Sequence, residues 1–162
     1  MQTISILTSR FALAASLTLL PVAMIGQTSS MSAASSNGAG ISASDKKFGQ
    51  RMVDDHTKAG DQLKEVASSK GISVPDKLSA KDEATKMRLS KLSGEQFDKA
   101  YMSDMVKDHT QDVADFRRES KSGMDPDVKN FASQTLPTLE DHLRKAKEIA
   151  PTTSASNKMG DQ

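Results

Sequence analysis

The sequence has 162 residues and no cysteine, so disulfides, lipoprotein anchoring and thiolate metal sites are excluded. Its charge is nearly balanced, with 22 Lys and Arg against 21 Asp and Glu, and aromatic residues make up 4% of the chain. Nucleic acid is therefore not expected as a partner, because its binding requires a basic surface and often aromatic stacking platforms. The length predicts a single domain.

The N-terminus has the pattern of an export signal. Arg10 supplies a positive charge, and residues 11–25 are almost wholly apolar. This apolar run is short for a membrane-spanning helix, which needs about 20 residues. We therefore expect a signal peptide at residues 1–26, with a retained N-terminal anchor as the alternative, and a location in the periplasm or associated with the outer envelope.

The rest of the chain divides into three parts by composition. Residues 27–44 are rich in Ser, Ala and Gly, carry no charge and are predicted to be a flexible linker. Residues 45–150 hold the periodic apolar patterns and are predicted to be the folded domain, and residues 151–162 a disordered tail. Sustained alternation of apolar and polar residues is missing, so the predicted fold class is all-α.

Four helices are predicted in the domain, at about 45–70, 80–92, 94–122 and from 126 onward. Each begins after a residue that commonly caps helices, namely Ser44, Ser79, Ser93 and Asp125. Ser93 also forms a capping-box pattern with Gln96. Pro137 is expected to kink the last helix, because proline removes a backbone donor and clashes with the preceding turn.

A repeat relates two of these helices. The pattern of the first copy is Phe48-x3-Met52-Val53-x-Asp55-His56-Thr57, and that of the second, 53 residues later, is Tyr101-x3-Met105-Val106-x-Asp108-His109-Thr110. Such a match predicts two related helices that face each other in a bundle. A third Asp-His pair, Asp141-His142, shares only the dipeptide.

The three histidines are the main candidate site. His56, His109 and His142 each lie on the apolar stripe of their helix, so their imidazoles are predicted to point into the bundle. Three converging imidazoles can bind a transition metal, either copper or another divalent cation. Met52 and Met105 precede His56 and His109 by one turn and are candidate soft ligands, although filling of the core is the simpler role for both.

A structural role for the histidines is the favoured interpretation, and metal binding is the alternative. A neutral core imidazole can donate to a carboxylate or a carbonyl on a neighbouring helix. The adjacent Asp55, Asp108 and Asp141 would then be structural residues that fix helix orientation, as would Pro137. Each aspartate points about 100° around the helix from its own histidine, which makes it a poor co-ligand.

Iron and hydrolytic chemistry receive little support. Di-iron bundles use Glu-x-x-His, whereas the residues three before the histidines are Val53, Val106 and Leu139. Neither a G-x-S-x-G motif nor a glycine-rich phosphate loop is present. A binding or structural role is therefore favoured over an enzymatic one.

An acidic ribbon occurs at helical spacing in the third predicted helix. It consists of Asp104, Asp108, Asp112 and Asp115. A solvated helix face is the expected role, and a weak surface for divalent cations is the alternative.

Several motifs resemble a known family. They include Met52-Val53-x-Asp55-His56, Leu92-Ser93-Gly94-x2-Phe97-Asp98 and Thr135-Leu136-Pro137. The chain resembles the bacterial exported, ferritin-like family numbered 4142 among the domains of unknown function, often described as predicted outer membrane protein. This resemblance implies a four-helix bundle and an envelope location, and it implies no established reaction.

The region before the first Asp-His helix departs from that family. Members carry an additional helix there with an acidic residue, whereas residues 27–44 have neither acidic residues nor an amphipathic pattern. We expect an all-α, ferritin-like up-down bundle that is either complete or lacks its first helix. In the second case an uncovered apolar groove would favour a protein partner, a homodimer or docking of the N-terminal segment, and a retained N-terminus would give peripheral membrane association.

Overall fold

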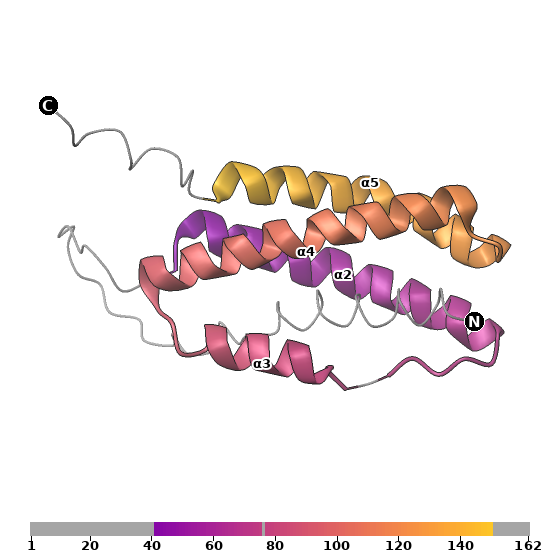
Figure 1. The fold of residues 1–162 in the computed structure, drawn as a ribbon, viewed down its shortest axis with the longest axis horizontal. Coiled ribbons are helices and arrows are strands. Elements are labelled where there is room, and N and C mark those ends of the chain that lie inside the picture. The colour runs from indigo at the N-terminus through magenta and orange to yellow at the C-terminus, as the bar shows by residue number, and fades with distance from the viewer. Residues whose placement is uncertain (1–40, 76, 151–162) are drawn as a thin grey trace, which may run out of the picture.

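The computed structural model describes residues 41–75 and 77–150, which form an all-α bundle. The four helices, labelled as in Figure 1, are α2 (Ala43–Ser69), α3 (Ala80–Leu89), α4 (Gly94–Ser122) and α5 (Pro126–Ile149). The all-α prediction is confirmed. Residues 1–40, with the predicted signal peptide and most of the linker, and the predicted tail at 151–162 lie outside the described residues. Within the described part, none of the helices combines the length and apolarity that crossing a membrane requires.

Successive helices run in alternating directions, as the up-down prediction requires (Figure 1). The long helices α2, α4 and α5 lie lengthwise beside one another, and α4 and α5 form the most extensive pair. The short helix α3 precedes α4 and packs on it. The α5 helix continues through Pro137 as one element.

Two of the four predicted caps are confirmed. The Ser79 hydroxyl accepts from the amide of Asp82 at 3.2 Å. The Asp125 carboxylate accepts from the amides of Asp127 and Val128, with Pro126 in the first helical turn. These side chains satisfy amides that have no partner within the helix.

Of the other two predicted caps, Ser44 is wrong, and Ser93 is correct in position only. Ser42, not Ser44, caps α2 and accepts from the Asp45 amide at 3.1 Å. The amide of Ser42 itself donates to Asp98 at 3.1 Å. Ser93 precedes α4 but its side chain makes no capping hydrogen bond. The next residue, Gly94, has a φ of 53°, so the first turn lacks the regular geometry of a capping box.

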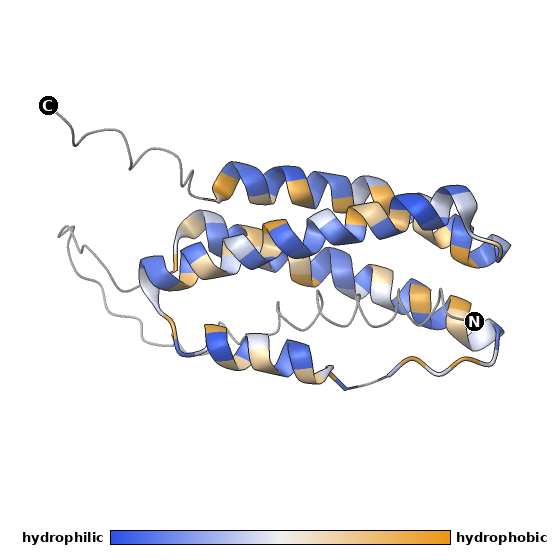
Figure 2. Ribbon diagram, in the orientation of Figure 1, coloured by the Kyte–Doolittle hydropathy of each residue, from blue (hydrophilic) through white to orange (hydrophobic). Residues whose placement is uncertain are grey.

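The interior contains two separate apolar clusters. Hydrophobic and polar residues alternate along each long helix (Figure 2), as expected of amphipathic helices in a bundle. The first cluster is formed by Ala59, Leu63, Val113, Phe116, Val128, Phe131, Ala132 and Leu139. The second is formed by Phe48, Met52, Leu89, Phe97, Tyr101, Met102, Met105 and Ala146.

Replacement of Gly60 by alanine is expected to stabilise the protein. Gly60 lies inside α2, and a Cβ atom built there meets nothing within 4 Å. The alanine restricts the unfolded chain without a clash, so we expect a gain of about 0.5–1 kcal/mol in the free energy of unfolding. Urea denaturation measures it. Gly71→Ala is the contrasting variant, because Gly71 has a φ of 65° that strains any side chain, and a loss of stability is expected there.

Candidate metal centre

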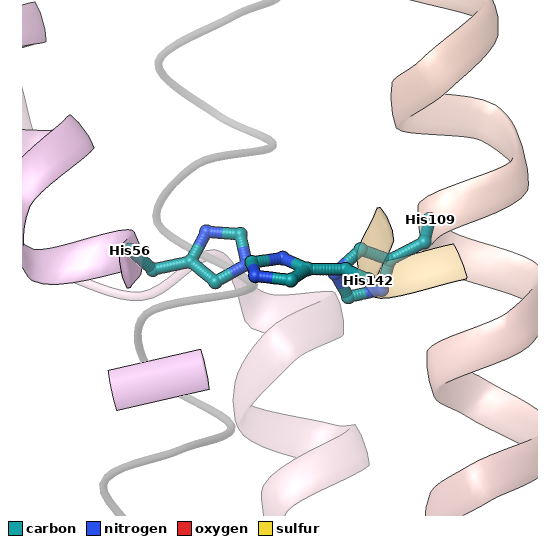
Figure 3. Close-up of side chains that lie close together, drawn as sticks. All are labelled: His56, His109 and His142. Atoms are coloured by element: carbon teal, nitrogen blue, oxygen red, sulfur yellow. The ribbon is translucent and has the colours of Figure 1, made fainter. Parts of the chain in front are cut away.

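Three histidines from three helices meet inside the bundle (Figure 3). His56 lies on α2, His109 on α4 and His142 on α5, and each is 1% exposed. Their ring centroids are 5.3–5.6 Å apart. One nitrogen from each ring can be chosen so that all three lie within 4.8 Å of one another. The prediction that the imidazoles converge in the bundle interior is confirmed.

The histidines occupy a polar layer between the two apolar clusters. His56 stands one turn from Met52 in the second cluster and close to Ala59 in the first. The other two histidines are likewise flanked along their helices by one residue of each cluster. Positions four apart share a helix face, so the packing of both clusters turns all three imidazoles inward.

The ring of His109 has one nitrogen engaged. Its Nδ1 lies 2.9 Å from the carbonyl oxygen of Met105, one turn back on α4. Since a carbonyl only accepts, Nδ1 carries the proton and donates it. The buried Nε2 then carries a lone pair, and it has no hydrogen-bond partner among the described residues.

In His142 one ring nitrogen also donates a hydrogen bond, but here the donor is Nε2 and not Nδ1. Its Nε2 donates to Oδ2 of Asp55 on α2 at 2.7 Å. Its buried Nδ1 therefore carries the lone pair, and this atom also has no hydrogen-bond partner in the described part of the chain. In both rings a hydrogen bond on one nitrogen leaves the other in the form that binds a metal.

Burial keeps the imidazoles neutral. It lowers the pKa of His56 to about 3, with further lowering by His109 and His142. It lowers the pKa of His109 to about 4. Burial also lowers the pKa of His142, against the opposing effect of Asp55. Neutral imidazole is the form that coordinates metal ions, so the site is ready for a cation at neutral pH.

An ion-pair network connects the layer to the surface. Asp55 accepts from His142 and also from Nε of Arg51 at 3.2 Å, and Arg51 reaches Asp141 on α5 at 2.6 Å. Burial by itself would raise the pKa of Asp55, but His142 and Arg51 lower it, so its carboxylate is charged. Asp141 in turn pairs with Arg144. The network ties α2 to α5 at the level of the histidines.

The predicted aspartates have unequal roles. Asp55 and Asp141 join helices, although Asp55 contacts the histidine of another helix and not its own neighbour. Asp108 is not part of this network, and burial raises its pKa, with a further contribution from Asp104. Arg51 was not predicted as a site residue, and its position one turn before Asp55 was the available signal.

Two further predictions concern residues near the layer. Met52 and Met105 are buried in the second apolar cluster, consistent with the core-filling role, and their metal-binding role stays a prediction. The acidic ribbon is not a fully solvated face, because Asp112 and Asp115 are buried. Asp115 is compensated locally by Arg118, whose guanidinium lies 2.8 Å away, and by Gln111.

Replacement of Asp55 by alanine is expected to lower stability by about 1–3 kcal/mol, because the buried N–H of His142 loses its acceptor. Thermal unfolding monitored by circular dichroism measures the effect. Asp54→Ala is the matched control, since the exposed Asp54 contacts only Gln50 on its own helix among the described residues. Equal melting temperatures for the two variants would contradict the structural role of Asp55.

A solved structure of another protein has the same fold as this chain. A crystal structure of a DUF305 fragment from Deinococcus radiodurans superposes with a TM-score of 0.68 at 16% sequence identity, covering 91% of this chain and 92% of that one. This likeness shows the fold alone. A search of curated proteins gives no significant match.

The sequence profile of one protein family also matches this chain. It matches residues 27–149, so the match begins within the segment predicted as a linker. It covers most of the chain and includes all three histidines and the ion-pair network. The chain therefore belongs to the family described as domain of unknown function DUF4142.

Proposed function

We propose that this protein is a metal-binding helical bundle that holds one transition-metal ion between His56, His109 and His142. The observation that carries the proposal is the pair of buried ring nitrogens, Nε2 of His109 and Nδ1 of His142, that have lone pairs and no hydrogen-bond partner in the described structure. The three rings can each offer one nitrogen to a group whose members lie within 4.8 Å of one another. The family has no assigned reaction, and the proposal is a binding role.

The hydrogen bonds of the two rings support a metal site over a purely structural one. Metal-ligating histidines usually donate their second nitrogen to a carboxylate or a backbone carbonyl, and these two rings do both. A structural imidazole needs the same bonds, but its other nitrogen would be buried without compensation, at about 1–3 kcal/mol each. A bound cation removes this penalty.

Metal analysis of the purified full-length chain tests the proposal. The protein is stripped with a chelator, titrated with Cu(I), Zn(II) or Ni(II), desalted and subjected to elemental analysis. We expect one ion per chain for at least one metal. The double variant His56→Leu/His109→Leu should lose it, while Met124→Leu, at a 98% exposed methionine, should retain it as a matched control. Equal metal content in the parent chain, the double variant and Met124→Leu would contradict the proposal.

The stability of the metal-free variant separates the two roles. Leucine replaces a partly unsatisfied imidazole with an apolar group, so a metal site predicts that metal-free His109→Leu is as stable as the parent or more so. A structural role predicts a lower melting temperature, because the hydrogen bond to Met105 is lost. Thermal unfolding in the presence of a chelator gives the answer directly.

We also infer that the protein is exported to the cell envelope. The support is the apolar run at residues 11–25 after Arg10, which lies outside the described residues. N-terminal sequencing of protein from the periplasmic and membrane fractions tests this. A mature start near Gln27 or beyond supports a cleaved signal, a start at Met1 in the membrane fraction supports an anchor, and protein confined to the cytosol contradicts export.

A further inference from the structure

We infer that the histidine site selects a monovalent soft cation, of the class of Cu(I), over a divalent one. This inference rests on the proposed metal site and deepens it by naming the ion class. Three features carry it: the net charge around the imidazoles, the number of donors and the nature of the neighbouring side chains.

The charges that face the site sum to one negative charge. The three imidazoles are neutral. The charged groups that connect directly to them through the ion-pair network are Asp55, Arg51 and Asp141, two carboxylates and one guanidinium. Further out, Arg144 pairs with Asp141 and with Glu148, and Lys145 also pairs with Glu148. The side chains of Arg144, Glu148 and Lys145 are exposed, so water and salt screen their effect on the buried site. A single positive charge in the site is therefore neutralised, whereas a dication leaves one charge uncompensated.

Burial of the site makes the uncompensated charge of a divalent ion energetically costly. Each histidine is 1% exposed, so an ion held between them exchanges its water for a weakly polar interior. The penalty for such a transfer rises with the square of the ion's charge, and it is repaid only by opposite charge and donor atoms in the site. A dication would need a second anion from solvent, whereas the protein already supplies the anion that a monovalent ion requires.

The donor set points the same way. In the described part of the chain, no fourth histidine, aspartate or glutamate joins the three nitrogens. Zn(II) held by three protein ligands takes a water molecule as its fourth ligand. The three histidines are each 1% exposed, so a site without that water suits Cu(I), which is satisfied by two or three donors. The buried Met52 and Met105 stand one turn before His56 and His109, and thioethers are soft groups that favour Cu(I).

Three ions with filled d shells provide the test. Cu(I), Ag(I) and Zn(II) are all d¹⁰ and have no ligand-field preference, so they differ mainly in charge and coordination number. Dissociation constants are measured for the full-length chain by competition with chelators, without oxygen for Cu(I). We expect one Cu(I) or Ag(I) per chain, bound at least tenfold more tightly than Zn(II).

Two variants on the ion-pair network change the charge in opposite directions. Arg51→Gln and Asp141→Asn both break the ion pair between these two residues, and each also removes one further pair, that of Arg51 with Asp55 or that of Asp141 with Arg144. The first brings the local charge from one to two negative, and the second brings it to zero. We expect the affinity for Zn(II) relative to Ag(I) to rise about tenfold in Arg51→Gln and to fall in Asp141→Asn. Lys47→Gln, at an exposed lysine on the same helix, should leave the ratio unchanged.

The outcomes distinguish this inference from the proposed function. Tight Zn(II) binding with no preference for Ag(I), or an equal change of the ratio in both network variants, would overturn the charge selectivity while the metal site stands. If none of the three ions binds stoichiometrically, both the metal site and this inference are overturned. Circular dichroism of each variant confirms that only folded protein is compared.

Discussion

Saturation with the bound ion is expected to raise the melting temperature of the protein by about 10 °C. An ion that binds only the folded chain stabilises it by about 2.7 kcal/mol when its free concentration is one hundred times the dissociation constant. For a domain of this size, each kcal/mol shifts the melting temperature by several degrees. The measurement is differential scanning calorimetry of the stripped chain over a series of buffered free-ion concentrations.

The same series in a variant separates site binding from general effects. His109→Leu removes one nitrogen donor from the centre of the layer, so its melting temperature should hardly respond to the ion. Met124→Leu should respond like the parent, since Met124 lies in the exposed turn before α5. A parallel rise in His109→Leu would place the stabilising ion elsewhere on the protein.

Acid is expected to destabilise the metal-free protein well above the range in which carboxylates titrate. Burial lowers the pKa of His56 to about 3 and that of His109 to about 4, against 6.5 for an unperturbed histidine. Between these values the unfolded chain binds protons that the folded chain excludes. Stability is therefore complete above about pH 6.5 and falls as the pH drops towards 4.

The two histidines together predict a loss of about 4 kcal/mol between pH 7.5 and pH 5. This is a large part of the 5–15 kcal/mol typical of a domain. Urea denaturation at several pH values, with chelator present, measures the slope. Asp55, Arg51 and Asp141 face the cluster but stay charged in this range. The double variant His56→Leu/His109→Leu should keep only the smaller pH dependence that comes from His142, whose pKa burial also lowers. An unchanged slope in that variant would refute the assignment.

The placement of the histidines could be predicted from the sequence because it follows from local periodicity. His56 and His109 sit on the apolar stripes of helices whose repeat is visible in the sequence, and His142 lies between Leu139 and Ala146 on a third stripe. Spacing along a helix determines which face a residue occupies. Three inward faces in one small bundle leave little room for the imidazoles except against one another.

The partners of the site residues were not predictable in this way. Asp55 points away from His56, as its position requires, and yet it meets His142, which is 87 residues away in the chain. That contact depends on the axial register of α2 against α5, which no local pattern contains. The burial of Asp112 was missed for a similar reason, since charge favours an exposed face unless neighbouring elements cover it. Register also decided which nitrogen of His142 is left for a ligand.

The layer of three histidines divides the interior of the bundle into two apolar parts. Two apolar clusters lie on opposite sides of three imidazoles, and the buried residues of one are not continuous with those of the other. Cooperativity between the two ends of the bundle must therefore pass along the helix backbones and through the layer itself. An ion bound by all three histidines would link the three helices at this level. Backbone amides at the two ends of the bundle should therefore exchange their hydrogens independently in the metal-free protein and cooperatively in the metal-bound protein.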